Sequence, residues 1–273
     1  MTNQNDAPMP QDLPPILAPK DHDAPSVFLV EGLLREARRQ RHLGDIAVPE
    51  ICLLDPDGDV VRHLRSTGAA VQHANWACYH SEMWVTKYGG FEIGIVPCAV
   101  GGPYAVLVAS ELHASGCQLI VSVTSAGRVL PLGDPPYFVL IEKARRDEGT
   151  SLHYLPPSEW VHLNPSIGER LTAAFDELEE PVCVGASWTT DAPFRETESA
   201  IAAAEAAGVH TVEMESASLY AYAQATQQDL VCVAHVTNTM AVEGDDFEKG
   251  ADDGTYRILA VVEAIARGWS KGF

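Results

Sequence analysis

Apolar and polar positions change their spacing repeatedly along this chain. From residue 26 onward, short apolar runs of strand length alternate with segments whose apolar residues recur at helical spacing. The pattern predicts strands at Glu50–Leu54, Phe91–Cys98, Gln118–Thr124, Tyr137–Glu142, Pro181–Ala186, Thr211–Glu213 and Leu230–Thr237. It predicts helices at Leu33–Leu43, Gly58–Ser66, Tyr104–Ala114, Ser166–Glu177, Glu196–Ala207, Ser216–Ala225 and Thr255–Arg267. Such alternation is typical of a mostly parallel sheet with helices on both faces.

The pattern shows neither an internal repeat nor an interdomain linker. We therefore predict a single α/β domain over residues 26–273, with a mixed, mostly parallel central sheet between two helical layers. Residues 1–25 carry six prolines among polar and acidic residues. That composition predicts an N-terminal tail that is mobile or lies over a partner subunit.

Charge narrows the classes of partner. The chain has a net charge of −20, which argues against nucleic acid and anionic membrane surfaces as partners. A small anionic substrate stays compatible with this charge, because a few arginines and backbone amides can hold one phosphate locally. Four arginines crowd the predicted helix Leu33–Leu43, where we expect surface or intersubunit ion pairs: Arg35, Arg38, Arg39 and Arg41.

The six cysteines are scattered without a close pairing motif, and most lie in apolar runs, so we expect buried, reduced thiols. Cys78-Tyr79-His80 lacks a second group of ligands, so no metal site is predicted. No apolar run is long enough to span a membrane, and the N-terminus lacks a signal pattern. The expectation is a cytoplasmic protein.

Two acids stand where a β-branched strand gives way to a helix without a polar stripe. Glu213, Met214 and Glu215 occupy this junction. A buried carboxylate needs hydrogen-bond donors, and a bound sugar would supply them. Alternatively, the two glutamates answer the positive end of the helix dipole. Taken alone, the junction favours the dipole interpretation.

In α/β folds of this kind, ligands bind beyond the carboxyl ends of the strands. The turns to consider follow Cys98, Thr124, Ala186, Val212 and Val236. They contain paired glycines before Pro103, the hydroxyl of Ser125, a loop with aromatic and charged residues at 187–197, and the amide of Asn238. Each has a structural alternative: glycine packing, a serine bonded to its own backbone, helix capping or a turn asparagine.

Taken together, these turns resemble the nucleoside phosphorylase family, which includes uridine phosphorylase, bacterial purine nucleoside phosphorylase and methylthioadenosine nucleosidases. The resemblance spans about residues 95–240, in family order. Its motifs are VGGPYA (100–105), TSAG (124–127), RDEGTSLHY (146–154), TTDAPF (189–194), VEMESASLY (212–220) and HVTN (235–238). The family cleaves the N-glycosidic bond between ribose and a base within an α/β fold.

The resemblance also implies roles for individual residues. Met214 and Glu215 would line the ribose, Glu215 holding its 2′- and 3′-hydroxyls and Glu213 supporting the site; Glu215 and Asn238 would be the catalytic pair. The phosphate contacts would be Ser125, Gly101 and Arg62. The base would meet Ala126, Gly127, Asp191, Phe194, Arg195 and Asn238. Inorganic phosphate would be a co-substrate, with no other cofactor, and the assembly a homo-oligomer, either a dimer or a hexamer of dimers.

Several departures from the family pattern concern the attacking group and the base. Ser122 stands where many phosphorolytic members have an arginine, and Leu54-Asp55-Pro56-Asp57-Gly58 replaces a Gly-Asp-Pro turn followed by an arginine. The Gln-x-Arg pair that reads uracil is absent after Phe194. The candidate substitutes are Arg62, Arg128, Arg195 or one of Arg35–Arg41 from a neighbouring subunit.

The predicted activity is that of a uridine phosphorylase-like pentosyltransferase. It would convert nucleoside and phosphate to ribose 1-phosphate and free base. Two alternatives stay open: a nucleosidase that uses water, and a nucleoside-binding protein without catalysis.

Overall fold

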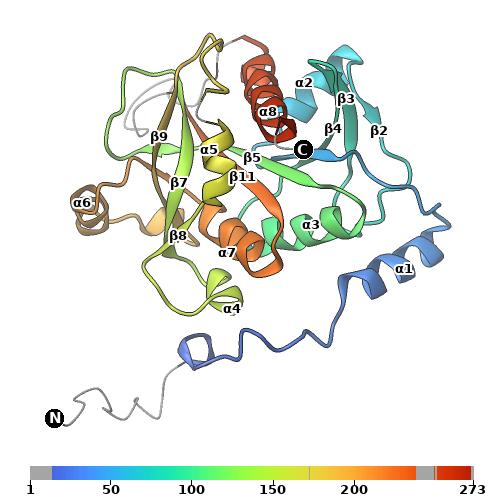
Figure 1. Ribbon diagram of the computed structural model, residues 1–273, viewed down its shortest axis with the longest axis horizontal. Helices are drawn as coiled ribbons and strands as arrows, with labels where there is room; N and C mark the ends of the chain where they lie inside the picture. The colour runs from blue at the N-terminus through green and yellow to red at the C-terminus, as the bar shows by residue number, and fades with distance from the viewer. Residues whose placement is uncertain (1–13, 172, 238–248, 250, 272–273) are drawn as a thin grey trace.

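The computed structural model describes residues 14–171, 173–237, 249 and 251–271 (Figure 1). Its strands form one sheet in the order β2-β3-β4-β1-β5-β11-β7-β9-β10-β6, with β8 paired to β7. The strands are β1 (Ile51–Asp55), β2 (Val71–Gln72), β3 (Trp84–Tyr88), β4 (Phe91–Pro97), β5 (Leu119–Ser125), β6 (Gly127–Arg128), β7 (Tyr137–Asp147), β8 (Trp160–His162), β9 (Val182–Thr190), β10 (Thr211–Glu213) and β11 (Asp229–Val236).

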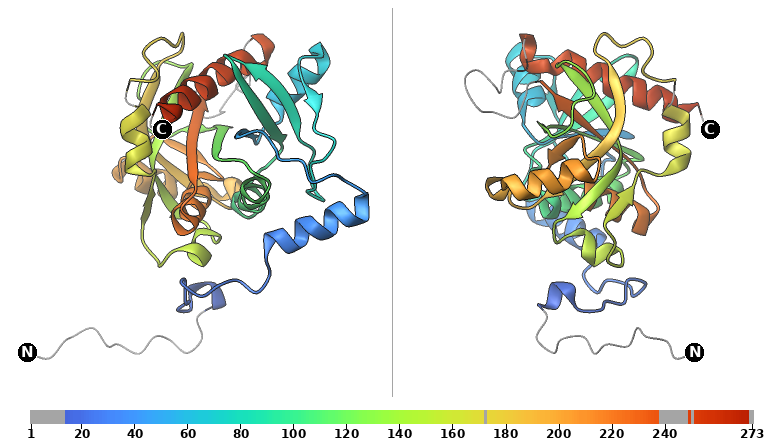
Figure 2. Two further views of the ribbon diagram at one scale, coloured as in Figure 1. Left: turned by 45° about the vertical axis from the view of Figure 1, so that its right-hand side comes forward. Right: turned by 90° about the vertical axis from the view of Figure 1, so that its left-hand side faces the viewer.

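Helices cover both faces of this sheet. The helices are α1 (Val30–Arg41), α2 (Asp59–Thr67), α3 (Gly102–Ala114), α4 (Ser151–Tyr154), α5 (Pro165–Leu171), α6 (Glu198–Ala206), α7 (Ser216–Thr226) and α8 (Thr255–Ser270), with 3₁₀ turns η1 (Pro15–Leu17), η2 (Pro193–Arg195) and η3 (Ala251–Gly254). Figure 2 shows α8 on one side of the strands and α3 and α7 on the other. α2 and α5 pack on α8, whereas α1, α4 and α7 belong to the α3 side.

The mixed sheet confirms the predicted fold class. β4, β1, β5 and β11 run parallel, as do β7, β9 and β10, and the two groups meet where β11 and β7 are antiparallel. The central strands β1, β5 and β11 are almost wholly buried and rich in Val, Ile and Leu, as expected for strands covered on both faces.

The edge strand β6 follows directly in sequence after the central strand β5. Only Ala126 separates β5 from β6, yet β6 lies at the end of the strand order, where Gly127 pairs with Val212 of β10. This half of the sheet therefore curls round, and the end of β5 meets the end of β10. The curl brings together turns from two strand groups that run in opposite directions.

The structure corrects several predicted boundaries. β7 and β9 pair as far as Asp147 and Thr190, so the strand does not end at Ala186 as predicted. The helix predicted for Ser166–Glu177 ends at Leu171, which lies against Gly268 of α8. The two-residue strands β2 and β6, as well as β3 and β8, were missed, because short edge strands carry little periodicity.

Two further expectations from the sequence, on the cysteines and on membrane spans, can be compared with the structure. All six thiols are free, but Cys98 is exposed and Cys183 half-buried, so burial was predicted wrongly for these two. Cys98 ends an apolar run, and its backbone turns with a φ of 60° at the mouth of the sheet. Among the described residues, no helix is long and apolar enough to cross a membrane.

Candidate active site

Both carboxylate oxygens of Glu213 are hydrogen-bonded within the strand-to-helix junction. Its Oε1 accepts hydrogen bonds from the hydroxyls of Ser187 (3.1 Å) and Thr189 (2.6 Å). Its Oε2 accepts the backbone N–H groups of Glu215 and Ser216, both at 2.7 Å. These are amides at the start of α7 that lack intrahelical partners, so Glu213 caps the helix. The dipole interpretation describes this glutamate.

Glu215 differs, because only one of its carboxylate oxygens has a hydrogen-bond partner among the described residues. Oε1 accepts the N–H of Gly101 at 2.7 Å, whereas Oε2 is buried without a hydrogen bond among the described residues. Burial, followed by the charge of Glu213, raises the pKa of Glu215 to about 8. The neighbouring Met214 is half-buried. A buried carboxylate oxygen without a donor is costly, so this atom is available to a ligand hydroxyl.

The amide that holds Glu215 belongs to a tight glycine turn. Gly101 has a φ of 85°, a conformation that favours glycine, and it directly precedes α3. Gly102 lies against α7: a Cβ there would be 2.1 Å from Oγ and 2.9 Å from Cβ of Ser218. The missing side chain of Gly102 thus lets α3 approach α7, and the positive φ of Gly101 aims its amide at Glu215.

Gly102→Ala should therefore destabilise the protein by about 1–3 kcal/mol, the usual cost of an overpacked contact. It should also lower activity, because the turn that carries the Gly101 amide must shift. Urea unfolding with activity measured on the same samples tests this. Gly133→Ala is the matched control, since nothing lies within 4 Å of its added Cβ. Equal stability of the two variants would contradict the packing argument.

Ser125 contacts a carboxylate of its own chain. Its N–H and Oγ donate to Oδ2 of Asp57 at 3.0 and 2.9 Å, and Lys249 Nζ lies 2.7 Å from the same oxygen. Lys249 also pairs with Asp59 at 2.6 Å, and its side chain is only 7% exposed. Burial opposes its charge, but the two aspartates raise the pKa of Lys249. Three donors thus converge on one anionic oxygen.

Asp57 and Glu215 share one electrostatic environment. Besides burial and Glu213, the charge of Asp57 contributes to the raised pKa of Glu215. The curled sheet explains this proximity, because it joins the ends of β5 and β10 through Gly127. Ala126 is fixed there by its N–H, which donates to the carbonyl of His235 at 3.2 Å.

The residues predicted to contact the base do not form one cluster among the described residues. Oδ2 of Asp191 accepts the N–H of Gly149 at 2.8 Å, which ties its loop to the start of α4. The side chain of Phe194, in η2, is fully exposed. Arg195 follows it in the same short turn. Asn238 lies outside the described residues.

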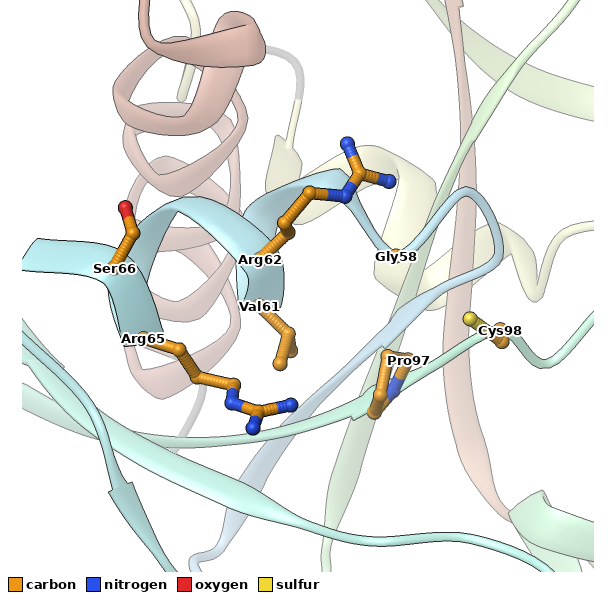
Figure 3. Close-up of a pocket in the computed structure, with 7 residues that line it drawn as sticks. All are labelled: Gly58, Val61, Arg62, Arg65, Ser66, Pro97 and Cys98. Carbon is orange, nitrogen blue, oxygen red and sulfur yellow. The ribbon is translucent and has the colours of Figure 1, made fainter.

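Arg62 lies beside the site on α2. It pairs with Asp59 at 2.6 Å and lines an open cavity of about 550 Å³. Figure 3 shows the side chains of Arg62 and Arg65 leaving α2 in opposite directions, with Arg65 reaching toward Pro97. The guanidinium of Arg65 stacks over the Trp84 ring, 4.4 Å from its centroid. Arg62 therefore already has a carboxylate partner.

Sequence reasoning missed the role of two residues at this site. Asp57 was noted only as a departure from the family turn, although a second acid directly after Asp55-Pro56 was a usable signal. Lys249 lies 192 residues from Asp57, and no local pattern marks it.

Comparison with known proteins agrees with the resemblance. A family model described as "Phosphorylase superfamily" matches residues 50–267. An uncharacterized protein, R802, of Acanthamoeba polyphaga mimivirus is 26% identical over 164 residues, covering 58% of this chain and 61% of that protein. The chain thus spans less than two thirds of that relative.

Among solved structures, a uridine phosphorylase of Vibrio fischeri ES114, complexed with 6-hydroxy-1-naphthoic acid, has the same fold. The TM-score is 0.67 at 16% identity, over 82% of this chain and 92% of that one. The family model covers most of the chain and includes the turns that form the site. The chain belongs to the phosphorylase superfamily.

Proposed function

We propose that this protein hydrolyses the N-glycosidic bond of a ribonucleoside, with Glu215 holding the sugar and Asp57 activating water. The observation that carries the proposal is the position of Asp57, whose Oδ2 takes both donors of Ser125. Family resemblance assigns those donors to phosphate. In this chain a carboxylate already uses them.

The ribose part of the proposal rests on Glu215. One of its oxygens is held by the Gly101 amide and the other is buried without a partner among the described residues. Vicinal sugar hydroxyls would provide the missing donors and orient the ring. Because glycosidic cleavage develops positive charge on the sugar, a nearby carboxylate also favours the transition state.

Water suits the attacking position better than phosphate does. A phosphate at Ser125 would have to displace Asp57 from the serine donors and would lie close to Asp57 and Asp59. Lys249 and Arg62 each already pair with two carboxylates. Negative charges close together repel each other, so a phosphate beside these carboxylates is disfavoured. A water molecule brings no charge and can pass a proton to Asp57.

Cleavage would join a water molecule to the sugar and release the base. The water oxygen forms a bond to the anomeric carbon of the ribose, while its proton passes to the Asp57 carboxylate. The bond between that carbon and the base nitrogen breaks, and the base leaves with the bonding electrons. It is then protonated, and the products are ribose and free base.

Phosphorolysis is the second candidate, and Lys249 is the observation that favours it. Its ammonium group points at the position next to Ser125 and could hold phosphate if Asp57 moved away. The products would then be ribose 1-phosphate and free base. A nucleoside-binding protein without catalysis is the third possibility.

One experiment separates the three. Purine and pyrimidine ribonucleosides are incubated with the protein in phosphate-free buffer containing ¹⁸O-water, and then with added phosphate. We expect free base in both buffers and one ¹⁸O atom in the ribose. If base is released only when phosphate is present and ribose 1-phosphate forms, the reaction is phosphorolysis and the proposal of hydrolysis is wrong. Tight nucleoside binding without release of base would refute catalysis altogether.

A further inference from the structure

A largely buried cluster of charged groups lies at the start of α8. Its centre is Glu180, which is 8% exposed. Nε2 of His235 lies 3.1 Å from Oε2 of this glutamate, and the guanidinium of Arg257 pairs with Oε1. Burial opposes the charge of Glu180, but the hydrogen bonds from His235 and Arg257 lower its pKa. The carboxylate is therefore charged, and it fixes the position of the Arg257 guanidinium.

Arg257 also holds the backbone of Lys249. Its Nη2 donates to the Lys249 carbonyl at 3.0 Å, while Nη1 pairs with Glu180. A guanidinium can serve two acceptors at once, because its donors form a rigid fork. Gly254, which precedes α8 with a φ of 69°, lies against the same lysine: a Cβ there would be 3.4 Å from Cβ of Lys249. The start of α8 thus determines where the Lys249 backbone lies.

These contacts continue into the active site. The ammonium group of Lys249 lies 2.7 Å from Oδ2 of Asp57, which also accepts the Ser125 hydroxyl at 2.9 Å. The next residue, Ala126, donates its N–H to the carbonyl of His235 at 3.2 Å. The contacts therefore form a closed ring, in the order Asp57, Ser125, Ala126, His235, Glu180, Arg257 and Lys249. Such a network restricts the position of each of its members.

The position of the Lys249 ammonium group matters because two acids meet there. Asp57 and Asp59 lie 2.7 and 2.6 Å from its Nζ. Burial opposes the charge of Lys249, but these aspartates raise its pKa. A cation between two carboxylates offsets their mutual repulsion. If that cation moves away, Asp59 repels Asp57, which is the residue that receives the proton in the proposed step.

We infer that Arg257 is a positioning residue, which holds the Lys249 backbone so that the ammonium group keeps Asp57 beside Ser125. Glu180 and His235 complete the arrangement by fixing the Arg257 guanidinium. The catalytic effect depends on the proposed hydrolysis, whereas the placement of Lys249 is measurable without turnover. Local spacing gives no sign of this role, since Glu180 and Arg257 are 77 residues apart.

Arg257→Lys separates the two contacts of the guanidinium. The shorter ammonium side chain keeps a positive charge for Glu180, so we expect the fold to survive, but it lacks the fork that also reaches the Lys249 carbonyl. Loss of the charge altogether would leave a buried carboxylate without its cation, which is costly. In Arg257→Lys, kcat for base release should fall by about tenfold to hundredfold, as a small misplacement of a catalytic group produces. KM should stay unchanged, because Glu215 still holds the sugar.

Acylation reports directly on the placement of Lys249. Its side chain is 7% exposed and protonated, so it should react slowly with an acetyl ester of N-hydroxysuccinimide, relative to the exposed Lys87. In Arg257→Lys the rate at Lys249 should rise by roughly tenfold, the effect of a one-unit fall in its pKa. Digestion and mass spectrometry give the modified fraction of each lysine. Arg170→Lys is the matched control, since Arg170 donates to the Trp269 carbonyl at the other end of α8; it should change neither kcat nor acylation.

Each result bears on a different part of the inference. An unchanged acylation rate of Lys249 in Arg257→Lys would overturn its placement by Arg257. A raised acylation rate with unchanged kcat would overturn the effect on catalysis, and so would an equal loss of kcat in Arg170→Lys. A wild-type protein that releases no base refutes the proposed hydrolysis, while the acylation rates still decide whether Arg257 places Lys249.

Discussion

Glu215→Gln should reduce kcat/KM by about 10²–10³-fold while the protein stays folded, the loss expected when a preorganised transition-state contact is removed. Glutamine keeps an oxygen for the Gly101 amide, which Glu215 accepts at 2.7 Å. A glutamine cannot carry the negative charge that deprotonated Glu215 presents to the cationic sugar ring, and it places an NH₂ group where Oε2 has no hydrogen bond among the described residues. Base release across a range of nucleoside concentrations measures the effect.

The same variant should be more stable than the wild type, and the gain should depend on pH. Because the pKa of Glu215 is raised from 4.5 to about 8, the folded protein retains a proton between these values that the unfolded chain has lost. Wild-type stability therefore falls from pH 4.5 toward pH 8 through this group. The advantage of Glu215→Gln should be absent near pH 4.5 and largest near pH 8.

Glu213→Gln is the matched control, with the opposite effect on stability. Glu213 accepts four hydrogen bonds, and a glutamine offers one acceptor oxygen to those donors. We expect a loss of about 1–3 kcal/mol, as for other buried groups deprived of partners. Thermal melts of both variants between pH 4.5 and 8 make the comparison. Destabilisation by Glu215→Gln at pH 8 would contradict the assignment of an unpartnered carboxylate.

Asp57→Asn should lower base release in phosphate-free buffer by about 10²–10⁴-fold, the range for loss of a general base. The asparagine oxygen can still accept from Ser125, which now donates to Oδ2 of Asp57 at 2.9 and 3.0 Å. The loop should therefore keep its shape, and the lost function is proton removal from water. Initial rates at saturating nucleoside give the decrease.

Asp59→Asn separates this role from the ion pair with lysine. Asp59 is the first residue of α2 and binds Lys249 at 2.6 Å, but it makes no hydrogen bond to Ser125 in the described structure. Its replacement should change base release far less than Asp57→Asn does. Similar losses of base release in both variants would indicate that Asp57 acts only as an ion-pair partner of Lys249. Phosphate-stimulated cleavage in Asp57→Asn would instead show that removing the carboxylate opens the phosphate position.

The fold class was predictable because it follows from local spacing. Strand-length apolar runs alternate with helical repeats from residue 26 onward, and the central strands appeared close to their expected places. The extension of β9 to Thr190 was missed, since pairing with β7 and β10 rather than residue preference decides where it ends. The edge strand β6 was missed for the same reason.

The sequence by itself determined that two acids stand at a strand-to-helix junction and that hydroxyls, glycines and an aspartate follow neighbouring strands. Only the tertiary structure decided which acid is satisfied. Glu213 meets Ser187 and Thr189 across the β9–β10 pairing, whereas Oε2 of Glu215 has no hydrogen bond among the described residues. It also decided that Asp57 meets Ser125, 68 residues away. A hydrogen bond needs its two atoms within about 3 Å. Such proximity depends on the register and curl of the whole sheet, which local periodicity does not encode.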